Sequence, residues 1–215
     1  MIQTKDLTFR YGPEAPEMRF PDLSCAKGDR MLLLGTSGAG KTTLLHLLSG
    51  LLRPSGGDIQ VDGTNIGQLS DRALDRFRGK HIGVVFQRAH FVQSLTVLEN
   101  LALPSFLTGK RPDVERAEAM LRDLGLEHKA TSRPGDLSVG EQQRASIARA
   151  LVHRPSVLLA DEPTSALDDQ STEAVVSLLE QQAEQAGATL LIVTHDSRLK
   201  DRYDRHIELQ SFSAS

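Results

Sequence analysis

A glycine-rich loop between a short apolar run and a helical pattern constrains the fold of this chain most strongly. The apolar run 31–34 has the composition of a buried strand, and it leads directly into the loop at residues 35–42. After the loop, leucines stand at positions 44, 45, 47 and 48, so we expect a helix over 41–49 that packs against the strand. A strand, a glycine loop and a helix in this order are typical of an α/β fold with a parallel sheet.

The rest of the chain continues this alternation of short apolar runs and helical patterns. We expect strands at 58–61, 82–86, 157–160 and 189–194, with a turn at Asp62-Gly63 after the first of them. Helices are expected at about 69–77 and at 172–186, the second ended by Gly187. The predicted fold class is therefore α/β, a nucleotide-type core with a mainly parallel sheet plus antiparallel strands, built from residues 1–87 and 155–215.

Residues 88–154 have a different character, because strand patterns vanish there and helical patterns replace them. One apolar stripe begins near Pro112 in an expected first turn and ends at Gly125. A second helix is expected from Ser138 to Arg154, stopped by Pro155. We interpret 88–154 as a helical subdomain inserted into the core of a single domain over 1–215, with Gln87 at one hinge.

The glycine loop matches the spacing that binds the phosphates of a nucleotide triphosphate, Gly35-x-x-x-x-Gly40-Lys41-Thr42. Its glycines let backbone N–H groups turn toward phosphate oxygens, and the helix N-terminus adds partial positive charge. Lys41 would reach the β- and γ-phosphates, and the Thr42 hydroxyl would complete the coordination of Mg²⁺. The predicted nucleotide contacts in this loop are Gly35, Thr36, Ser37, Gly38, Ala39, Gly40, Lys41, Thr42 and Thr43.

A second chemical signal is the apolar run 157–160, which ends in the carboxylates Asp161 and Glu162. The end of such a strand delivers Asp161 toward a metal ion. Glu162, one residue further on, can position or deprotonate an attacking water. Taken alone, this run is also compatible with a strand that ends in a solvated acidic turn.

Bulk properties exclude several function classes. The formal net charge is −3 and the pI about 6.2, so there is no basic footprint for nucleic acid. The single cysteine, Cys25, cannot form an internal disulfide, and the first residues lack the regions of a signal peptide. No apolar run approaches the roughly 20 residues of a membrane helix. If the protein works at a membrane, another chain must supply the span.

Six motifs in one order make the chain resemble the ATPases of the ATP-binding-cassette (ABC) superfamily, over about residues 1–209. The four further motifs are the signature run at 137–142, the crossing loop at 165–168, and the single residues Gln87 and His195. The resemblance implies that Tyr11 stacks on adenine, that Gln87 senses the γ-phosphate and Mg²⁺, and that His195 contacts the γ-phosphate. ATP and Mg²⁺ are therefore the expected cofactors, with Lys41, Gln87, Glu162 and His195 as catalytic residues and Thr42, Gln87 and Asp161 at the metal.

The same resemblance implies a second anion site at the start of the helix that begins near Ser138. Ser138, Gly140 and Glu141 would contact the ATP held by the opposite subunit, and Asp168 lies in the loop that crosses between subunits. Because the chain carries each half of this arrangement once, a head-to-tail homodimer is implied, or a heterodimer with a related chain. Two departures from the usual signature are Val139 for glycine and Glu141 for glutamine, from which we expect tuned affinity only.

Residues 69–101 resemble one branch of the superfamily, which contains the ATPases of lipoprotein release, macrolide and peptide efflux, and the bacterial division-site complex. This resemblance implies a subunit at the cytoplasmic face of the inner membrane that powers the export or extraction of a lipoprotein, peptide or hydrophobic small molecule. Residues 88–106 would contact the membrane permease; for the apolar residues there, packing in the subdomain core is an equal alternative. They are Phe91, Leu95, Val97, Leu98 and Leu101. Alternatives are a division-signalling ATPase without transport and a soluble ATPase of iron–sulfur assembly.

Overall fold

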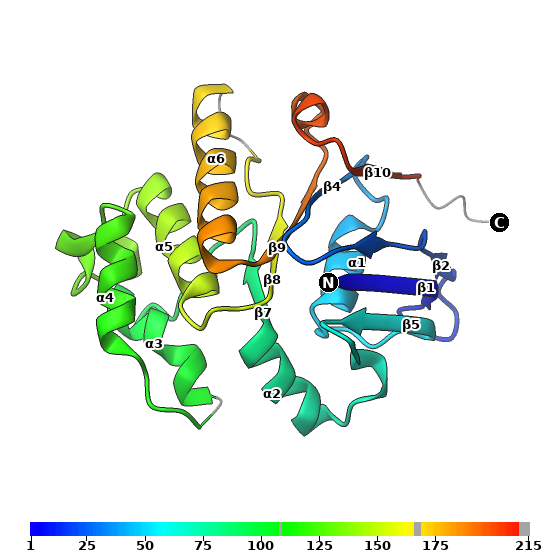
Figure 1. Ribbon diagram of the computed structural model, residues 1–215, viewed down its shortest axis with the longest axis horizontal. Coiled ribbons are helices and arrows are strands. Elements are labelled where there is room, and N and C mark those ends of the chain that lie inside the picture. Colours follow the sequence, from blue (N-terminus) through cyan, green and yellow to red (C-terminus); the bar gives the residue numbers. More distant parts are fainter. Residues whose placement is uncertain (108, 166–168, 211–215) are drawn as a thin grey trace.

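The computed structural model describes residues 1–107, 109–165 and 169–210, and these ranges build two β-sheets with helices around them (Figure 1). One sheet is parallel throughout, in the strand order β10-β4-β9-β8-β7. Its strands are β4 (Arg30–Gly35), β7 (Ile82–Val85), β8 (Val157–Asp161), β9 (Thr189–Thr194) and β10 (His206–Leu209). The α/β fold class and the mainly parallel sheet are confirmed.

The parallel sheet is buried on both faces, which explains why its strands are continuous apolar runs. In β4, Met31 and Leu33 point into one hydrophobic core, while Leu32 and Leu34 point into the other. Helix α6 (Asp169–Ala186) contributes Val176 and other residues to the second core. Helix α1 (Lys41–Leu48) contributes its leucines to the first.

The second sheet contains the antiparallel strands near the N-terminus. Strand β1 (Ile2–Phe9) pairs with β2, β3 and β5, and β5 also pairs with β6. Their bounds are β2 (Met18–Arg19), β3 (Ser24–Cys25), β5 (Gly56–Val61) and β6 (Thr64–Asn65). Residues of β1, β5 and α1 share one core with the parallel sheet, so α1 is packed by both sheets. The turn expected at Asp62-Gly63 connects β5 to β6.

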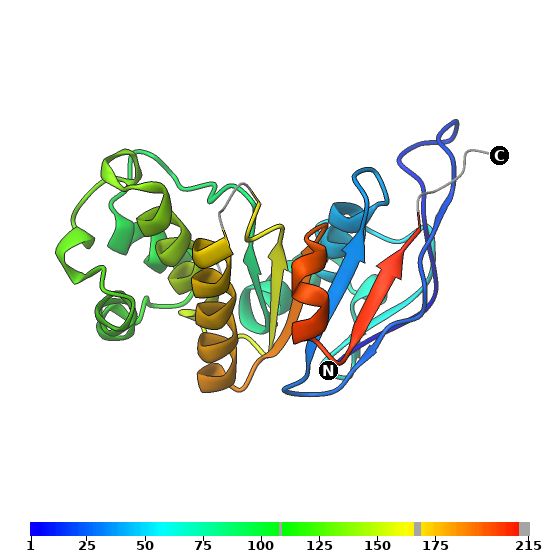
Figure 2. The same cartoon turned by 90° about the horizontal axis from the view of Figure 1, so that it is seen from above.

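Helices α3 (Val97–Leu107), α4 (Val114–Asp123) and α5 (Val139–Leu151) lie on the side of the parallel sheet away from the antiparallel sheet (Figures 1 and 2). Helix α2 (Asp71–His81) instead contributes Leu74 to the core that α1 shares with the antiparallel sheet. Short 3₁₀ helices span Ile66–Gln68, Glu127–Lys129, Pro134–Asp136 and Ser197–Arg202. None of the helices within the described ranges is long and apolar enough to cross a membrane.

The segment 88–154 is helical as expected, and no strand occurs among its described residues. Its apolar residues belong to the same core as one face of the parallel sheet: Leu121 and Ile147 share a cluster with Leu158 and Ile192. The helices therefore depend on the sheet for much of their burial. The division into a core over 1–87 and 155–215 and an inserted subdomain over 88–154 remains a prediction.

Several element boundaries differ from the sequence expectation. Helix α5 ends at Leu151 rather than Arg154, so Pro155 is not its immediate stop. Pro112 is not in the first turn of α4, because Asp113 is the N-cap and accepts a hydrogen bond from Arg116 N. Helix α6 begins at Asp169, three residues before the expected start. Gly187 has a φ of 64°, as a glycine that ends a helix requires.

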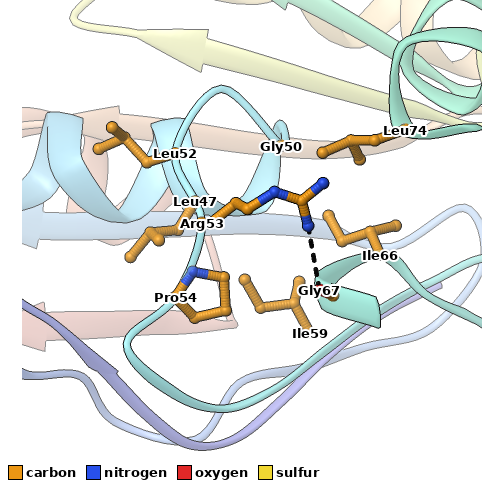
Figure 3. Close-up of a pocket in the computed structure, with 9 residues that line it drawn as sticks. All are labelled: Leu47, Gly50, Leu52, Arg53, Pro54, Ile59, Ile66, Gly67 and Leu74. Atoms are coloured by element: carbon orange, nitrogen blue, oxygen red, sulfur yellow. Dashed lines mark hydrogen bonds between the residues drawn. The ribbon is translucent and has the colours of Figure 1, made fainter. Parts of the chain in front are cut away.

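A recess between the end of α1, β5 and α2 has no room for a water molecule. Figure 3 shows Arg53 crossing it, where the guanidinium donates hydrogen bonds to Gly67 O (3.2 Å) and Leu69 O (2.8 Å). Aliphatic residues such as Ile59 and Leu74 fill the remaining space. The recess is a packed seam and holds no ligand site.

Candidate active site

A cavity of about 540 Å³ opens beside the carboxyl ends of the parallel strands. Parallel strands present their carboxyl ends at one edge of the sheet, where the loops after β4, β7, β8 and β9 meet. The cavity therefore combines residues that are far apart in the sequence. Its lining residues are Tyr11, Met18, Ser37, Gly38, Gly40, Lys41, Thr42, Thr43, Gln87, Glu162 and His195.

The glycine loop forms the floor of this cavity. Gly38 and Gly40 have φ angles of 81° and 80°, in the left-handed region that glycine adopts without strain. Gly40 is also the N-cap of α1, so the helix begins with N–H groups at the loop. Lys41 is only 7% exposed, and its Nζ donates to Gly35 O (2.9 Å) and Thr36 O (3.0 Å). The ammonium is thus held at a defined position beneath the cavity.

The carboxylate of Glu162 is held from two sides. Its Oε1 lies 3.3 Å from Lys41 Nζ. Its Oε2 is 2.8 Å from His195 Nδ1 and accepts hydrogen bonds from Thr194 Oγ1 (3.0 Å) and His195 N (3.3 Å). Burial pushes the pKa of Glu162 upward, but these hydrogen bonds, led by that of His195, hold the pKa below its usual range. The group is therefore an anion with a fixed orientation.

Thr42 and Asp161 form a pair of oxygen ligands. The Thr42 hydroxyl donates to Asp161 Oδ1 at 3.4 Å, and burial raises the pKa of Asp161, with a further contribution from neighbouring Glu162. No cluster of three His, Cys, Asp or Glu metal ligands occurs in the described part of the chain. Mg²⁺ commonly takes one or two carboxylates together with phosphate oxygens and water, so a hydroxyl and one carboxylate beside a phosphate loop fit this ion.

Gln87 follows β7 and lines the same cavity, and its Nε2 donates to Ser165 Oγ at 3.1 Å. Ser165 is the first residue of the predicted crossing loop 165–168 and lies three residues after Glu162. The side chain of Gln87 is therefore tied to the segment that carries the carboxylates. Asp168, the other predicted contact of this loop, lies outside the described residues.

Tyr11 stands at the rim of the cavity. Its hydroxyl is 2.8 Å from Thr43 Oγ1, and its ring meets the Phe9 ring edge-on at 4.8 Å between centroids. The side chain is 66% exposed, so a ring face is accessible for stacking. Met18, which pairs with Phe9 in the antiparallel sheet, lines the cavity too. No sequence motif marks Met18, because its position depends on strand pairing.

Ser138, Gly140 and Glu141 form a separate site at the start of α5. Ser138 is the N-cap: its Oγ accepts from Glu141 N, and Glu141 Oε2 accepts from Ser138 N at 2.7 Å, a complete capping box. These three residues are not among the described residues that line the cavity. Val139 is 76% exposed. One chain thus does not bring its own signature run to its own glycine loop.

Comparisons with known proteins identify the family of this chain. A family model described as ABC transporter matches residues 19–165. The chain is 41% identical to a lipoprotein-releasing system ATP-binding protein LolD from Geobacter metallireducens. The match covers 97% of this chain and 95% of that protein. It is also 40% identical to the LolD protein of Shewanella denitrificans, in a match that covers 88% of this chain and 82% of that protein.

A solved structure has the same fold. It is the dimeric post-hydrolysis state of an ATP-binding cassette bound to ADP and Pi, with a TM-score of 0.86 and 33% identity. The match covers 99% of this chain and 97% of that one. The family model spans both the glycine loop and the signature run, and the fold agrees over nearly the whole length. The chain belongs to the ABC transporter family and is an ATPase that uses ATP and Mg²⁺.

Proposed function

We propose that this ATPase powers a membrane complex that extracts lipoproteins, as a peripheral subunit at the cytoplasmic face of the inner membrane. The observation that carries the proposal is the 41% identity over almost the full length to a protein named for lipoprotein release. The match extends through residues 88–106, the segment we assign to contact with the membrane partner. This match favours lipoprotein extraction over the division-signalling and iron–sulfur-assembly alternatives.

In the proposed mechanism, the glycine loop and Lys41 bind the phosphates of ATP and neutralise their charge. Thr42, Asp161 and Gln87 would hold Mg²⁺, which would supply neutralisation of the phosphate charge. Glu162 orients the attacking water and accepts its proton, a role that requires an ionised carboxylate with a fixed orientation. His195 holds Glu162 in place through the bond from Nδ1 and contacts the γ-phosphate.

The signature run completes the site of a second copy in this proposal. Ser138 and Gly140 lie at the N-terminus of a helix of 13 residues, where N–H groups and the helix dipole attract anions. They lie apart from the glycine loop of their own chain, so a head-to-tail partner has to bring ATP to them. The cassette that resembles this chain is dimeric in its post-hydrolysis structure. ATP binding would close such a dimer, and hydrolysis with phosphate release would reopen it.

Contact with the membrane partner is assigned to the surface of residues 88–106. Phe91, Val97 and Leu101 are buried, which favours core packing for these three, while Leu95 and Leu98 are partly exposed. The exposed apolar side chains of this segment are instead Val92, at 40%, and Phe106, at 63%. These two residues are the apolar contacts that we propose for the membrane subunit.

The proposal is tested by purifying tagged Glu162→Gln from solubilised membranes of the native cell with ATP and Mg²⁺. We expect a partner with few membrane helices and a large extracytoplasmic domain, together with lipoprotein. Glu184→Gln, a change at an exposed carboxylate on α6 outside the cavity, is the matched control and should recover the complex without the ATP-dependent trapping. A many-helix permease, or soluble partners alone, would contradict the proposal.

A further inference from the structure

A half-buried arginine holds the backbone just after Gln87. Arg149, on α5, donates from Nη1 to His90 O (3.0 Å) and from Nη2 to Ala89 O. The centre of its guanidinium lies 4.7 Å from the centroid of the Phe91 ring. A planar guanidinium presents several donors in a fixed fork and stacks well on aromatic faces. One side chain therefore contacts three consecutive residues of the segment 89–91.

This placement is costly for a charged group. Burial lowers the pKa of Arg149, because removal from water penalises the charged form, and no neighbouring charge offsets this in the described part of the chain. An apolar side chain of similar size would fill the same space without that cost. What the guanidinium specifically adds is the pair of hydrogen bonds to Ala89 O and His90 O.

Those two bonds hold the peptide planes on either side of a strained residue. His90 has a φ of 42°, in the left-handed region that residues other than glycine rarely adopt. Such a conformation persists only where its surroundings stabilise it, and it is found preferentially at functional sites. The carbonyl of Ala89 belongs to the peptide before His90 and that of His90 to the peptide after it, so Arg149 fixes both.

A second side chain, which is fully buried, secures the next residue. Asn100 is fully buried on α3; its Oδ1 accepts from Val92 N at 2.8 Å and its Nδ2 donates to Val92 O at 3.1 Å. Segment 89–92 is thus anchored by two helices, while β7 ends at Val85. Gln87 lies in the short link between the end of β7 and the segment 89–92. The relative position of these two parts therefore decides where the Gln87 side chain points.

Helix α5 is itself seated directly on β7. A Cβ added at Gly83 would lie 2.3 Å from Ala150 O, and Ala150 is the neighbour of Arg149. The same helix begins at the signature run, where Ser138 is the N-cap. A displacement of α5 relative to β7 therefore moves the Arg149 guanidinium, the segment 89–91 and Gln87 together.

We propose that Arg149 is a positioning residue for ATP hydrolysis, which aims Gln87 into the cavity and links it to the helix that carries the signature run. The inference rests on the proposed role of Gln87 at the metal and γ-phosphate. It assigns to Arg149 no contact with nucleotide. Loss of Arg149 should lower ATP turnover with Mg²⁺. It should leave ATP affinity without Mg²⁺ nearly unchanged, because phosphate binding depends on the glycine loop.

The test compares Arg149→Met, Gln87→Ala and the double variant by ATP turnover of the purified chain and by ATP affinity without Mg²⁺. We expect Arg149→Met to lower kcat at least tenfold and to change the Mg²⁺-free affinity less than twofold. Because Arg149 acts through Gln87, the double variant should be no slower than Gln87→Ala within a factor of two. Arg149→Lys, with a single ammonium, should keep part of the turnover.

Arg116→Met is the matched control. Arg116, on α4, donates to Val152 O (2.7 Å) and Leu151 O (3.4 Å) at the far end of α5, so its loss removes the same kind of bonds without touching 89–91. Its kcat should stay within twofold of the unmodified chain, with thermal unfolding measured for every variant. If Arg149→Met does not fold, Arg149→Lys takes its place in the comparison with Gln87→Ala.

Three results would overturn the inference. The first is a kcat of Arg149→Met within twofold of the unmodified chain, and the second is an equal loss of kcat in Arg149→Met and Arg116→Met. The third is a double variant whose kcat falls below that of Gln87→Ala by the same factor that Arg149→Met loses alone. A slow Gln87→Ala beside a fast Arg149→Met overturns the role of Arg149 alone. Unchanged turnover in Gln87→Ala overturns the proposed role of Gln87, and with it the basis of the inference.

Discussion

His195 Nδ1 lies 2.8 Å from Glu162 Oε2, and this contact connects the residue after β9 with the residue after β8. Glu162 has a φ of 47°, a left-handed conformation that costs free energy outside glycine. The donors of Thr194 and His195 converge on a single oxygen of the carboxylate. The strained residue is therefore held by its partners with a defined carboxylate orientation.

We expect His195→Ala to lower ATP turnover by about 10²-fold, the lower part of the range for a positioned acid–base group. The reason is that Glu162 loses the bond that orients it, while the glycine loop is unchanged. His195→Asn is the matched variant, because an amide nitrogen can stand close to the position of Nδ1, and it should keep a measurable part of the turnover. Equal turnover in His195→Ala and the unmodified chain would contradict this account. The measurement is steady-state phosphate release at saturating ATP and Mg²⁺.

The chemical core of the site was predictable because its motifs are local. A strand that ends in Asp161 and Glu162, and a glycine loop before a helix, place their groups by backbone geometry within a few residues. The bonds between segments were not predictable in the same way. The contacts from Gln87 to Ser165 and from Lys41 to Glu162 join residues 78 and 121 positions apart, which only the sheet order brings together.

Some elements were missed because their local patterns are disturbed. In β1 the alternation of buried and exposed residues is interrupted by an irregularity between Lys5 and Thr8, so no regular period-2 pattern marks the strand. Helix α3 contains Pro104, which argues against a helix interior. A capping box was the available signal for α3, since Thr96 Oγ1 accepts from Glu99 N and Glu99 Oε2 accepts from Thr96 N.

Tyr11 provides a prediction for the adenine end of the site. Stacking of a base on an aromatic side chain contributes about 1–3 kcal/mol. Tyr11→Ala should therefore weaken ATP binding by about 5- to 150-fold. Tyr11→Phe loses only the contact with Thr43 Oγ1 and should bind within about threefold of the unmodified chain. Calorimetric titration with ATP measures both. Equal affinities for Tyr11→Ala and Tyr11→Phe would exclude stacking by this ring.

Gly83 provides a prediction about stability. Gly83→Ala places a Cβ 2.3 Å from Ala150 O and 3.1 Å from Pro155 Cγ, so α5 has to move away from β7. Overpacking of this kind costs about 1–3 kcal/mol, which lowers Tm by roughly 2–4 °C per kcal/mol in a chain of this size. Gly135→Ala is the control, since a Cβ there meets nothing within 4 Å. A Tm of Gly83→Ala equal to that of the control would contradict the close packing of α5 on β7.

His153 makes stability depend on pH. Burial lowers the pKa of His153, with further contributions from Lys110 and Arg116, although the contact of Nε2 with Ile82 O at 3.2 Å opposes the shift. The unfolded chain therefore binds a proton at His153 more readily than the folded chain, and stability falls as pH decreases below about 6.5. His153→Gln should flatten this loss between pH 7.5 and 5.5. Parallel Tm profiles for the two proteins would contradict the assignment.

The most direct test of the proposed head-to-tail dimer is the mass of purified Glu162→Gln, measured by sedimentation with saturating ATP and Mg²⁺. Removal of the general base should nearly abolish turnover and leave the phosphate contacts of Lys41 and the glycine loop in place. The account predicts a stable dimer in ATP that returns to monomer when ATP is removed, and that does not form in Ser138→Arg/Glu162→Gln, where a bulky side chain replaces the N-cap of α5. A Glu162→Gln protein that binds ATP and stays monomeric would contradict it.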